Sequence, residues 1–106
     1  MPVLAKIRAL SNETRFEIVM LVRDREMEAG TVAKHFKMSR PAVSQHLGTL
    51  RKAGLLQERR VGSKRLYVVR QEGFDELLKF IKGYWGPRLQ RLKAAAEAVE
   101  RSKVRK

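Results

Sequence analysis

The chain has 106 residues, and we expect them to form one compact domain over residues 1–106. It has no cysteine, which excludes disulfides, thiolate metal sites and thiol redox sensing. Its 24 Lys and Arg residues and 11 Asp and Glu residues give a net charge of +13, which favours a polyanionic partner such as nucleic acid. The longest apolar run, residues 18–22, is too short to cross a membrane, and the N-terminus lacks the apolar stretch of a signal peptide. We therefore expect a cytoplasmic protein.

The excess positive charge is concentrated in the middle of the chain. Residues 37–70 carry nine basic side chains and one acidic side chain, a net charge of +8. Residues 1–36 have a net charge of only +1, and residues 71–106 have a net charge of +4. A local basic patch of this kind is typical of a surface that binds nucleic acid.

Three short helices are predicted in the first third of the chain. Apolar residues at helical spacing place the first helix over about residues 1–10. Ser11 or Asn12 is the expected N-cap of a second helix. Gly30 interrupts the helical pattern, and residues 31–36 are predicted as a third, short helix.

The fourth predicted helix, residues 39–53, has two unlike faces. Ser39 is its expected N-cap, and Gly54 is expected to end it. The inward face is an ordinary apolar stripe of Val43, Leu47 and Leu50. The outward face is small, uncharged and hydrogen-bonding near its start and basic near its end, and consists of Pro41, Ser44, Gln45, Gly48 and Lys52.

A hairpin and further helices are predicted after Gly54. Residues 55–70 change to a period of two, with Gly62–Ser63 at the tip of a basic hairpin. Helical spacing returns after Gly73, and Gly86–Pro87 is expected to interrupt or restart the helix. The predicted fold is therefore mainly α with a small β-hairpin, in the order α-α-α-α-β-β-α-α, a winged helix–turn–helix.

Residues 31–53 have the pattern of a helix–turn–helix, whose second helix enters the major groove of DNA. Lys37 stands in the turn where a glycine is usual, and a positive φ at Lys37 would cost about 1 kcal/mol. Small side chains on the outward face allow close approach to base edges. The expected base contacts are Arg40, Pro41, Ser44, Gln45 and His46. The expected contacts with the DNA backbone, partly through the hairpin as a wing, are Ser39, Thr49, Arg51, Lys52, Arg59, Arg60, Lys64 and Arg65.

The stretch from about residue 4 to residue 70 resembles the ArsR/SmtB family of bacterial and archaeal winged-helix repressors. Its most specific part is S-x-x-x-V-S-x-H-L-x-x-L-x-x-A-G-L-L, which begins at Ser39. The resemblance implies a homodimer that binds pseudo-palindromic operator DNA and blocks transcription until an inducer weakens binding. It also implies that residues 1–10 and about 74–100 form the dimerisation helices. The expected dimer-interface residues are Val3, Leu4, Ile7, Leu10, Trp85, Leu89, Leu92 and Val99.

Many members of this family sense metals, but their ligands are missing from this sequence. The usual thiol site aligns near Glu28 and Gly30, which are not ligands of that type. The helix after the hairpin carries Asp75 and Glu76, expected to face solvent, but no histidine. We therefore expect no metal and no cofactor. A small-molecule effector near Tyr84 and Trp85 stays open as an alternative to a plain dimer core.

Two other functions remain alternatives to a specific repressor. A non-specific architectural nucleic-acid-binding protein would need only the high positive charge. A monomeric protein–protein adaptor could use the same fold without binding DNA. Enzyme activity has no support, because the sequence contains no nucleophile–base motif, no phosphate-binding glycine-rich loop and no metal-ligand cluster.

Overall fold

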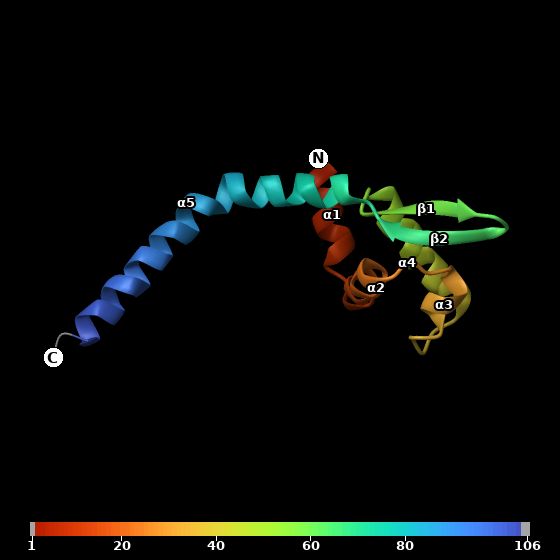
Figure 1. Cartoon of the computed structure of the whole chain (residues 1–106), viewed down its shortest axis with the longest axis horizontal. Helices are drawn as coiled ribbons and strands as arrows, with labels where there is room; N and C mark the ends of the chain where they lie inside the picture. Colours follow the sequence, from red (N-terminus) through yellow and green to blue (C-terminus); the bar gives the residue numbers. More distant parts are fainter. Residues whose placement is uncertain (1, 105–106) are drawn as a thin grey trace.

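The structure, a computed structural model, describes residues 2–104, which form five helices and one two-stranded antiparallel sheet (Figure 1). This is a winged helix–turn–helix, so the predicted fold class is confirmed. The elements in chain order are α1 (Pro2–Leu10), α2 (Glu13–Asp24), α3 (Ala29–Ala33), α4 (Arg40–Lys52), β1 (Leu56–Val61), β2 (Lys64–Val69) and α5 (Gln71–Val104).

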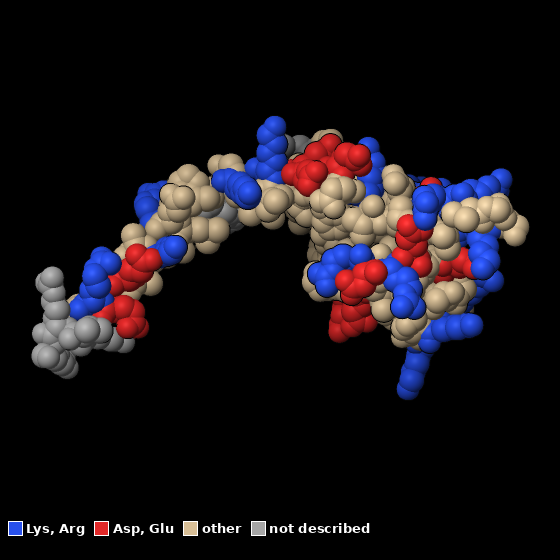
Figure 2. All heavy atoms as spheres, viewed as in Figure 1, with Lys and Arg blue, Asp and Glu red and all other residues tan. Residues whose placement is uncertain are grey.

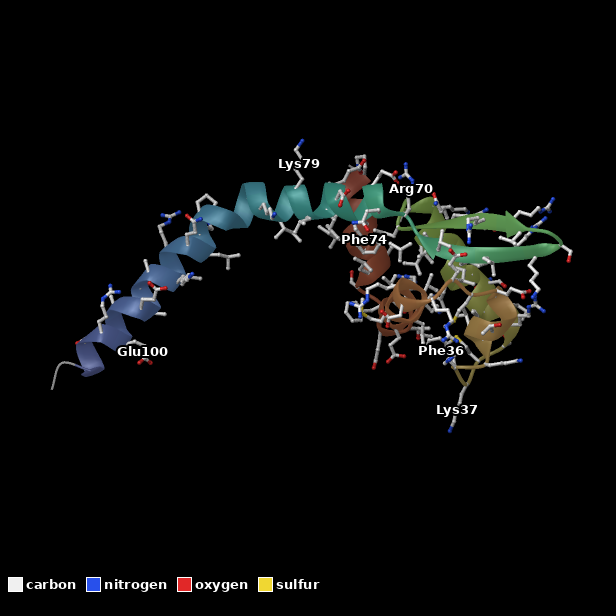
Figure 3. All side chains as sticks on the ribbon, in the orientation of Figure 1. Phe36, Lys37, Arg70, Phe74, Lys79 and Glu100 are labelled. Carbon is white, nitrogen blue, oxygen red and sulfur yellow. The ribbon has the colours of Figure 1, made fainter. Side chains whose placement is uncertain are left out.

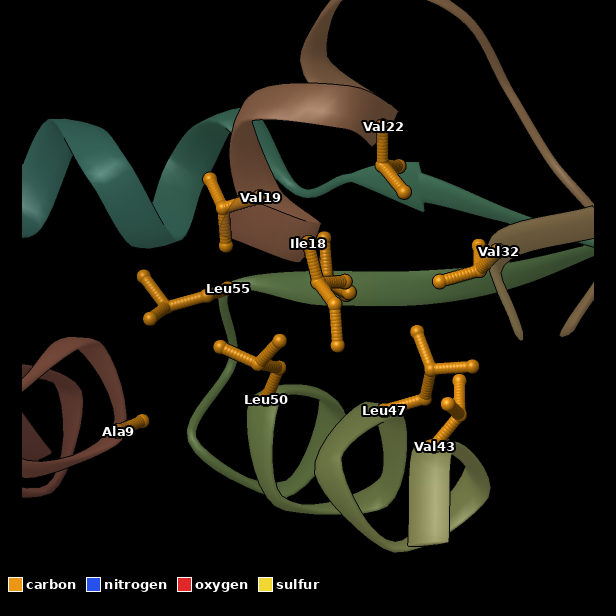
Figure 4. Close-up of a cluster of buried hydrophobic side chains, with 10 residues drawn as sticks. Ala9, Ile18, Val19, Val22, Val32, Val43, Leu47, Leu50 and Leu55 are labelled. Carbon is orange, nitrogen blue, oxygen red and sulfur yellow. The ribbon is translucent and has the colours of Figure 1, made fainter. Parts of the chain in front are cut away.

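The hydrophobic core lies where α2, α3, α4 and the base of the hairpin meet (Figure 4). The stripe predicted on α4 faces this core, because residues three and four apart lie on the same side of a helix. Ala9 is the single residue of α1 in the buried cluster, so most of the apolar surface of α1 and α5 lies outside it. The buried side chains are Ala9, Ile18, Val19, Val22, Val32, Val43, Leu47, Leu50, Leu55 and Leu56.

Side-chain caps begin α2 and α4, which both contribute to the hydrophobic core. Asn12 caps α2, because its Oδ1 accepts a hydrogen bond from the backbone N of Arg15 at 3.0 Å. The alternative cap, Ser11, instead bonds back to α1. Ser39 caps α4 as predicted, because its Oγ accepts from the backbone N of Ala42 at 3.3 Å. Each cap satisfies a backbone N–H that the helix itself leaves without a partner.

The helix before α4 differs from the sequence prediction. α3 spans Ala29–Ala33 rather than residues 31–36, and Gly30 lies inside it instead of ending the helical pattern. The turn that follows needs no left-handed residue: within residues 2–104, positive φ angles occur at glycines alone. Lys37 therefore replaces the usual turn glycine without the conformational cost considered above.

α4 ends in a tight turn that packs on the first turn of α5. Gly54 has a φ of 83° and ends the helix as predicted, while the backbone N of Leu55 donates to the carbonyl of Leu50 at 3.0 Å. A Cβ added to Gly73 would lie 1.9 Å from the carbonyl oxygen of Gly54. Glycine is therefore required at position 73, and the contact fixes the start of α5 against the end of α4.

The hairpin forms as predicted, with Gly62–Ser63 at its tip. Gly62 has a φ of 63°, which suits the first central position of a type II′ turn. The free edge of β2 is met by Met27, in the loop between α2 and α3. Tyr67 N donates to Met27 O at 2.8 Å, and Met27 N donates to Tyr67 O at 3.3 Å. This pairing attaches the hairpin to the body of the domain.

α5 is one helix from Gln71 to Val104, so the predicted interruption at Gly86–Pro87 and the two separate C-terminal helices are wrong. Pro87 lies inside the helix, and Figure 1 shows the helix bending before it extends away from the body. A proline removes one backbone hydrogen bond and bends a helix without always ending it.

The N-terminal turns of α5 are attached to α1 by an ion pair. Lys6 is buried, and its Nζ lies 3.0 Å from Oε2 of Glu76. Glu76 is exposed as expected, but it also provides the counter-charge for this buried ammonium group. Without that partner, a buried charge would be costly.

Candidate nucleic-acid interface

α4 separates its residues into a buried stripe and an exposed polar face. Val43, Leu47 and Leu50 are completely buried, which fixes the rotation of the helix about its axis. The opposite face is presented to solvent, and its exposed residues are Arg40, Pro41, Ser44, Gln45, Thr49 and Lys52. Ser44 and Gln45 supply hydroxyl and amide groups, which can donate to and accept from base edges.

Gly48 lies on this face and has no structural requirement for glycine. A Cβ added at this position would meet no heavy atom within 4 Å. Glycine is also unfavourable in a helix interior by roughly 0.5–1 kcal/mol relative to alanine. The missing side chain therefore keeps the outer surface of α4 low at the centre of its exposed face.

Arg40 extends from the start of α4 towards α3. The atom Cζ of Arg40 lies 3.7 Å from the position that a Cβ on Gly30 would occupy. The guanidinium lines a cleft of about 490 Å3 together with Thr31 and Lys34. The structure thus places Arg40 beside α3 rather than over the centre of the polar face.

His46 lies on the flank of α4 that faces α2 and is partly buried. Its Nδ1 lies 3.4 Å from Nη1 of Arg15. Because a guanidinium can only donate, a hydrogen bond between these two groups requires Nδ1 of His46 to accept. Arg15 also donates through Nε to the carbonyl of Ala9 at 2.7 Å, so His46 belongs to a contact that joins α1, α2 and α4.

The tip of the hairpin concentrates positive charge. Arg60 and Arg65 are directly opposite each other in the register of the two strands, and Lys64 pairs with Val61 at the turn. All three cationic side chains are exposed. Like charges directly opposite each other destabilise an isolated hairpin, so this arrangement favours a polyanion beside the wing. Figure 2 shows Lys and Arg side chains along this hairpin.

Glu58 is the single acidic residue of the basic segment, and it connects three elements. Its Oε1 lies 3.3 Å from Nη1 of Arg51 on α4. The same oxygen accepts a hydrogen bond from the hydroxyl of Tyr67 on β2 at 3.0 Å. Burial, followed by this hydrogen bond and the charge of Glu58, raises the pKa of Tyr67 above its usual value. Glu58 therefore links the hairpin to the C-terminal part of α4.

Arg59 is also paired with a carboxylate inside the protein. Its guanidinium bonds to Oε2 of Glu26, which precedes the Met27 bridge to β2. Arg51 and Arg59 were both expected to contact the DNA backbone, and in this structure each guanidinium is paired with a carboxylate, Arg51 with Glu58 and Arg59 with Glu26. Arg60 and Arg65 carry the exposed charge beyond them.

Two exposed lysines of the helix–turn–helix were missed by the sequence prediction. Lys34 follows α3, and Lys37 lies in the turn before α4 and points outward from the domain (Figure 3). Both precede α4 in the chain, whereas the hairpin follows it. They add positive charge near the N-terminal end of α4. The sequence could have indicated both lysines as cationic surface residues, because they lie within the predicted helix–turn–helix of a chain with high net positive charge.

The residues expected at a dimer interface do not share one environment. Leu4 and Ile7 on α1 are exposed, whereas Leu10 packs against the core. Val3 is half-buried, and the side chain of Trp85 lies outside the described residues. The remaining three lie exposed on α5 and are Leu89, Leu92 and Val99.

Within residues 2–104, no group of three or more His, Asp or Glu side chains is placed to hold a metal ion. In the same part of the chain, no helix combines the length and the apolar character needed to span a membrane.

Comparison with known proteins identifies the class that this fold and site define, a winged helix–turn–helix transcriptional regulator. The family model of bacterial regulatory proteins of the arsR family matches residues 12–58. The transcriptional repressor SdpR of Bacillus subtilis is 35% identical over 78 residues, which cover 70% of this chain and 87% of the repressor. The chain belongs to the arsR family.

Solved structures agree with this assignment. An ArsR-like transcriptional regulator from Rhodococcus sp. RHA1 is similar with a TM-score of 0.75 and 25% identity, covering 92% of each chain. A homodimeric winged helix–turn–helix DNA-binding domain from Mycobacterium bovis is similar with a TM-score of 0.65 and 26% identity, covering 76% of this chain and 75% of that domain. The similarity to both structures extends well beyond the residues of the family model.

Proposed function

We propose that this protein is a homodimeric repressor that binds a pseudo-palindromic operator in double-stranded DNA, with α4 in the major groove and the hairpin on the backbone or in the minor groove. The observation that carries the proposal is the exposed face of α4, which is low, uncharged and hydrogen-bonding at its centre and surrounded by cations. A repressor of this kind acts where the chromosome lies, which in a bacterial cell is the cytoplasm.

Ser44 and Gln45 are the best-supported base contacts. Both are exposed on the face opposite the buried stripe, and Gln45 carries the amide that pairs with an adenine edge. Pro41 and Gly48 allow the helix axis to approach the groove floor. Arg40 is better placed for a phosphate beside α3 than for a base, because its guanidinium lies over Gly30.

The backbone contacts fall into two groups. Arg60, Lys64 and Arg65 at the wing are exposed and can meet phosphates directly. Arg51 and Arg59 would first have to leave Glu58 and Glu26, so we assign them to wing positioning. At α4, the remaining expected contacts with the DNA backbone are Ser39, Thr49 and Lys52.

Dimerisation would use the apolar surface outside the core. We propose that residues 1–106 form one domain in which α1 and α5 provide the interface, with the helix–turn–helix and wing left free for DNA. Leu92 is 67% exposed and Leu4 is 44% exposed. Exposed apolar surface of this kind is typical of a surface that binds another protein chain. The similar domain from Mycobacterium bovis is homodimeric, which supports a dimer.

A salt titration separates specific binding from the non-specific alternative. Operator DNA selected with the protein and a random duplex are titrated at several salt concentrations. Specific readout predicts a gap between the two binding free energies of roughly 4–10 kcal/mol, together with half-sites one helical turn, about 10 bp, or a multiple apart. Equal affinity for both duplexes would favour an architectural protein, and no binding to either would favour an adaptor.

Two variants distinguish base readers from phosphate contacts. Gln45→Ala should reduce the gap between operator and random DNA by about 1–3 kcal/mol, because it removes a base contact. Arg60→Ala should weaken binding to both duplexes equally and reduce the slope of log affinity against log salt by about 1. If Gln45→Ala lowered both affinities equally, α4 would not be reading sequence through this residue.

A further inference from the structure

A cleft of about 620 Å3 lies between α2 and the turn that follows α3, on a part of the surface that the proposed DNA interface does not use. Its volume is in the range of small-molecule sites, which are mostly apolar with a few placed polar groups. The apolar side chains that line it are Met20, Leu21, Met27 and Phe36. Two carboxylates, Glu17 and Asp24, also line it, and Oδ1 of Asp24 lies 3.4 Å from Nε of Arg23.

The two carboxylates and the apolar residues follow one face of α2. Glu17 and Asp24 are seven residues apart, two helical turns, so their backbones lie about 10 Å apart along the helix axis. Met20 and Leu21 lie between them on the same face. The methionines of the cleft can adapt their shape to a ligand. The result is an apolar floor with negative charge at both ends.

The charge of the cleft contrasts with that of the whole chain. Among the charged residues that line the cleft, Glu17 and Asp24 contribute two negative charges and Arg25 contributes one positive charge. The lining is therefore net negative in a protein whose total charge is +13. The local charge of the cleft therefore has the opposite sign to the total charge of the chain and favours a cationic ligand.

We propose that this cleft binds an apolar organic cation, that is, an amine or quaternary ammonium ion carrying an aromatic or branched alkyl group. The apolar group would lie on Met20, Leu21 and Phe36, and the cationic group would lie near Glu17 or Asp24. Burial of the apolar group supplies the affinity, and the carboxylates select the sign of the charge.

The position of the cleft gives such a ligand a route to the DNA-binding elements, and this step rests on the proposed function. Met27 forms the backbone pair with Tyr67 that attaches the wing. His35 and Phe36 belong to the segment between α3 and α4, and Nδ1 of His35 lies 3.0 Å from the carbonyl of Thr31. A ligand in contact with both segments changes the relative position of α4 and the wing, and so lowers DNA affinity.

Methionine methyl NMR tests the binding site without DNA. The probes are 3-phenylpropyl-trimethylammonium, the neutral 3-phenylpropanol and the anionic 3-phenylpropanoate, which share one apolar group. We expect the ammonium ion to shift the methyl signals of Met20 and Met27 and to leave that of Met38, which does not line the cleft, unchanged. Equal binding of the anion, or shifts at Met38 as large as those at Met20, would overturn the proposal.

A charge-removing double variant provides the second measurement. Glu17→Gln together with Asp24→Asn should weaken ammonium binding about fivefold and leave phenylpropanol binding unchanged, because exposed ion pairs contribute only modestly to affinity. Glu13→Gln is the matched control, since Glu13 lies exposed on the same helix but does not line the cleft. An ammonium affinity that is the same in the double variant and the control would contradict the role of the carboxylates.

Binding of operator DNA is then measured with and without the ammonium probe. A lower DNA affinity in its presence, absent in the double variant at the same probe concentration, supports regulation through the cleft. An unchanged DNA affinity overturns the regulatory step while leaving the binding site intact. If the protein binds no DNA at all, the proposed function fails, and the methyl shifts still decide whether the cleft binds the cation.

Discussion

At the scale of single residues, the most informative positions are those whose side chain is not explained by the fold. Gly48 is such a position, because a Cβ added there would meet no heavy atom of the protein within 4 Å. Gly73 is the opposite case, because the carbonyl of Gly54 occupies the space that a side chain would need. Glycine therefore keeps the outer surface of α4 low at position 48, and it permits close packing of two backbone segments at position 73.

Gly48→Ala should change folding stability and DNA affinity in opposite directions. We expect the free energy of unfolding to rise by about 0.5–1 kcal/mol, since alanine is the better helix former and meets no neighbour. We expect DNA affinity to fall, because the added methyl group keeps α4 away from the groove floor. Urea unfolding and a duplex titration measure the two effects, and Gly83→Ala on α5 is the control for stability alone. Undiminished DNA affinity in Gly48→Ala would mean that this face does not approach DNA closely.

The exposure of the polar face of α4 could be predicted from the sequence, because Val43, Leu47 and Leu50 fix which side turns inward. The partners of the charged residues could not. Arg59 and Glu26 are 33 residues apart, and Arg15 and His46 are 31 apart, so these contacts depend on how separate elements pack. The sequence prediction consequently treated all wing arginines as equivalent DNA contacts.

At the scale of elements, two structural joints set the geometry of the DNA-binding half. One is the contact of the α4–β1 turn with the start of α5 through Gly54 and Gly73. The other is the pairing of Met27 with Tyr67, strengthened by the ion pair between Arg59 and Glu26. The first relates α4 to α5, and the second relates the wing to the loop after α2.

Gly73→Ala tests the first of these joints. A Cβ 1.9 Å from a backbone oxygen cannot be accommodated without moving α5 or the turn after α4, and overpacking of this kind costs typically 1–3 kcal/mol or more. We expect urea unfolding to show a loss of at least that size. Gly83→Ala, on the same helix with no heavy atom within 4 Å of the added Cβ, should instead be neutral or slightly stabilising. Similar effects for both variants would show that the close approach at Gly73 is absent.

The C-terminal helix was predicted with an interruption that the structure does not show. Gly86 and Pro87 are strong helix-breaking residues, which is why an interruption was expected there. The residues that follow include Leu89, Leu92 and the alanines 94–96, which favour helix strongly. Their combined preference outweighs the single hydrogen bond that Pro87 removes.

At the scale of the whole molecule, the chain is far from globular. Its radius of gyration is 18.9 Å, whereas a compact chain of this length has about 13 Å. Its extents of 66 × 29 × 22 Å come from α5, which leaves the body as a long helix (Figure 1). An exposed helix with leucines along one face gains its stability from packing against a partner.

Leu92→Glu tests whether that partner is a second copy. Each protomer of a two-fold dimer would lose one buried leucine, so we expect a loss of about 3–6 kcal/mol and a dimer dissociation constant at least roughly 100-fold higher. Sedimentation velocity over a concentration series measures this change. Ala94→Glu places the same charge on the opposite face of α5 and should leave the dimer unchanged. An unaltered dimer in Leu92→Glu would exclude this face of α5 from the interface.

The bend of α5 at Pro87 has a consequence for the spacing of the operator. Pro87 has no N–H to donate to the carbonyl of Gly83, so the helix can change direction there at low cost. If two copies join beyond the bend, the first half of α5, about 24 Å long, separates the bend from the DNA-binding part of each copy. The angle of the bend then sets the distance between the two α4 helices. A change of a few degrees in the bend angle at Pro87 then moves each α4 helix by about an ångström or more. A hinge far from the DNA would thus decide which half-site separation the protein accepts.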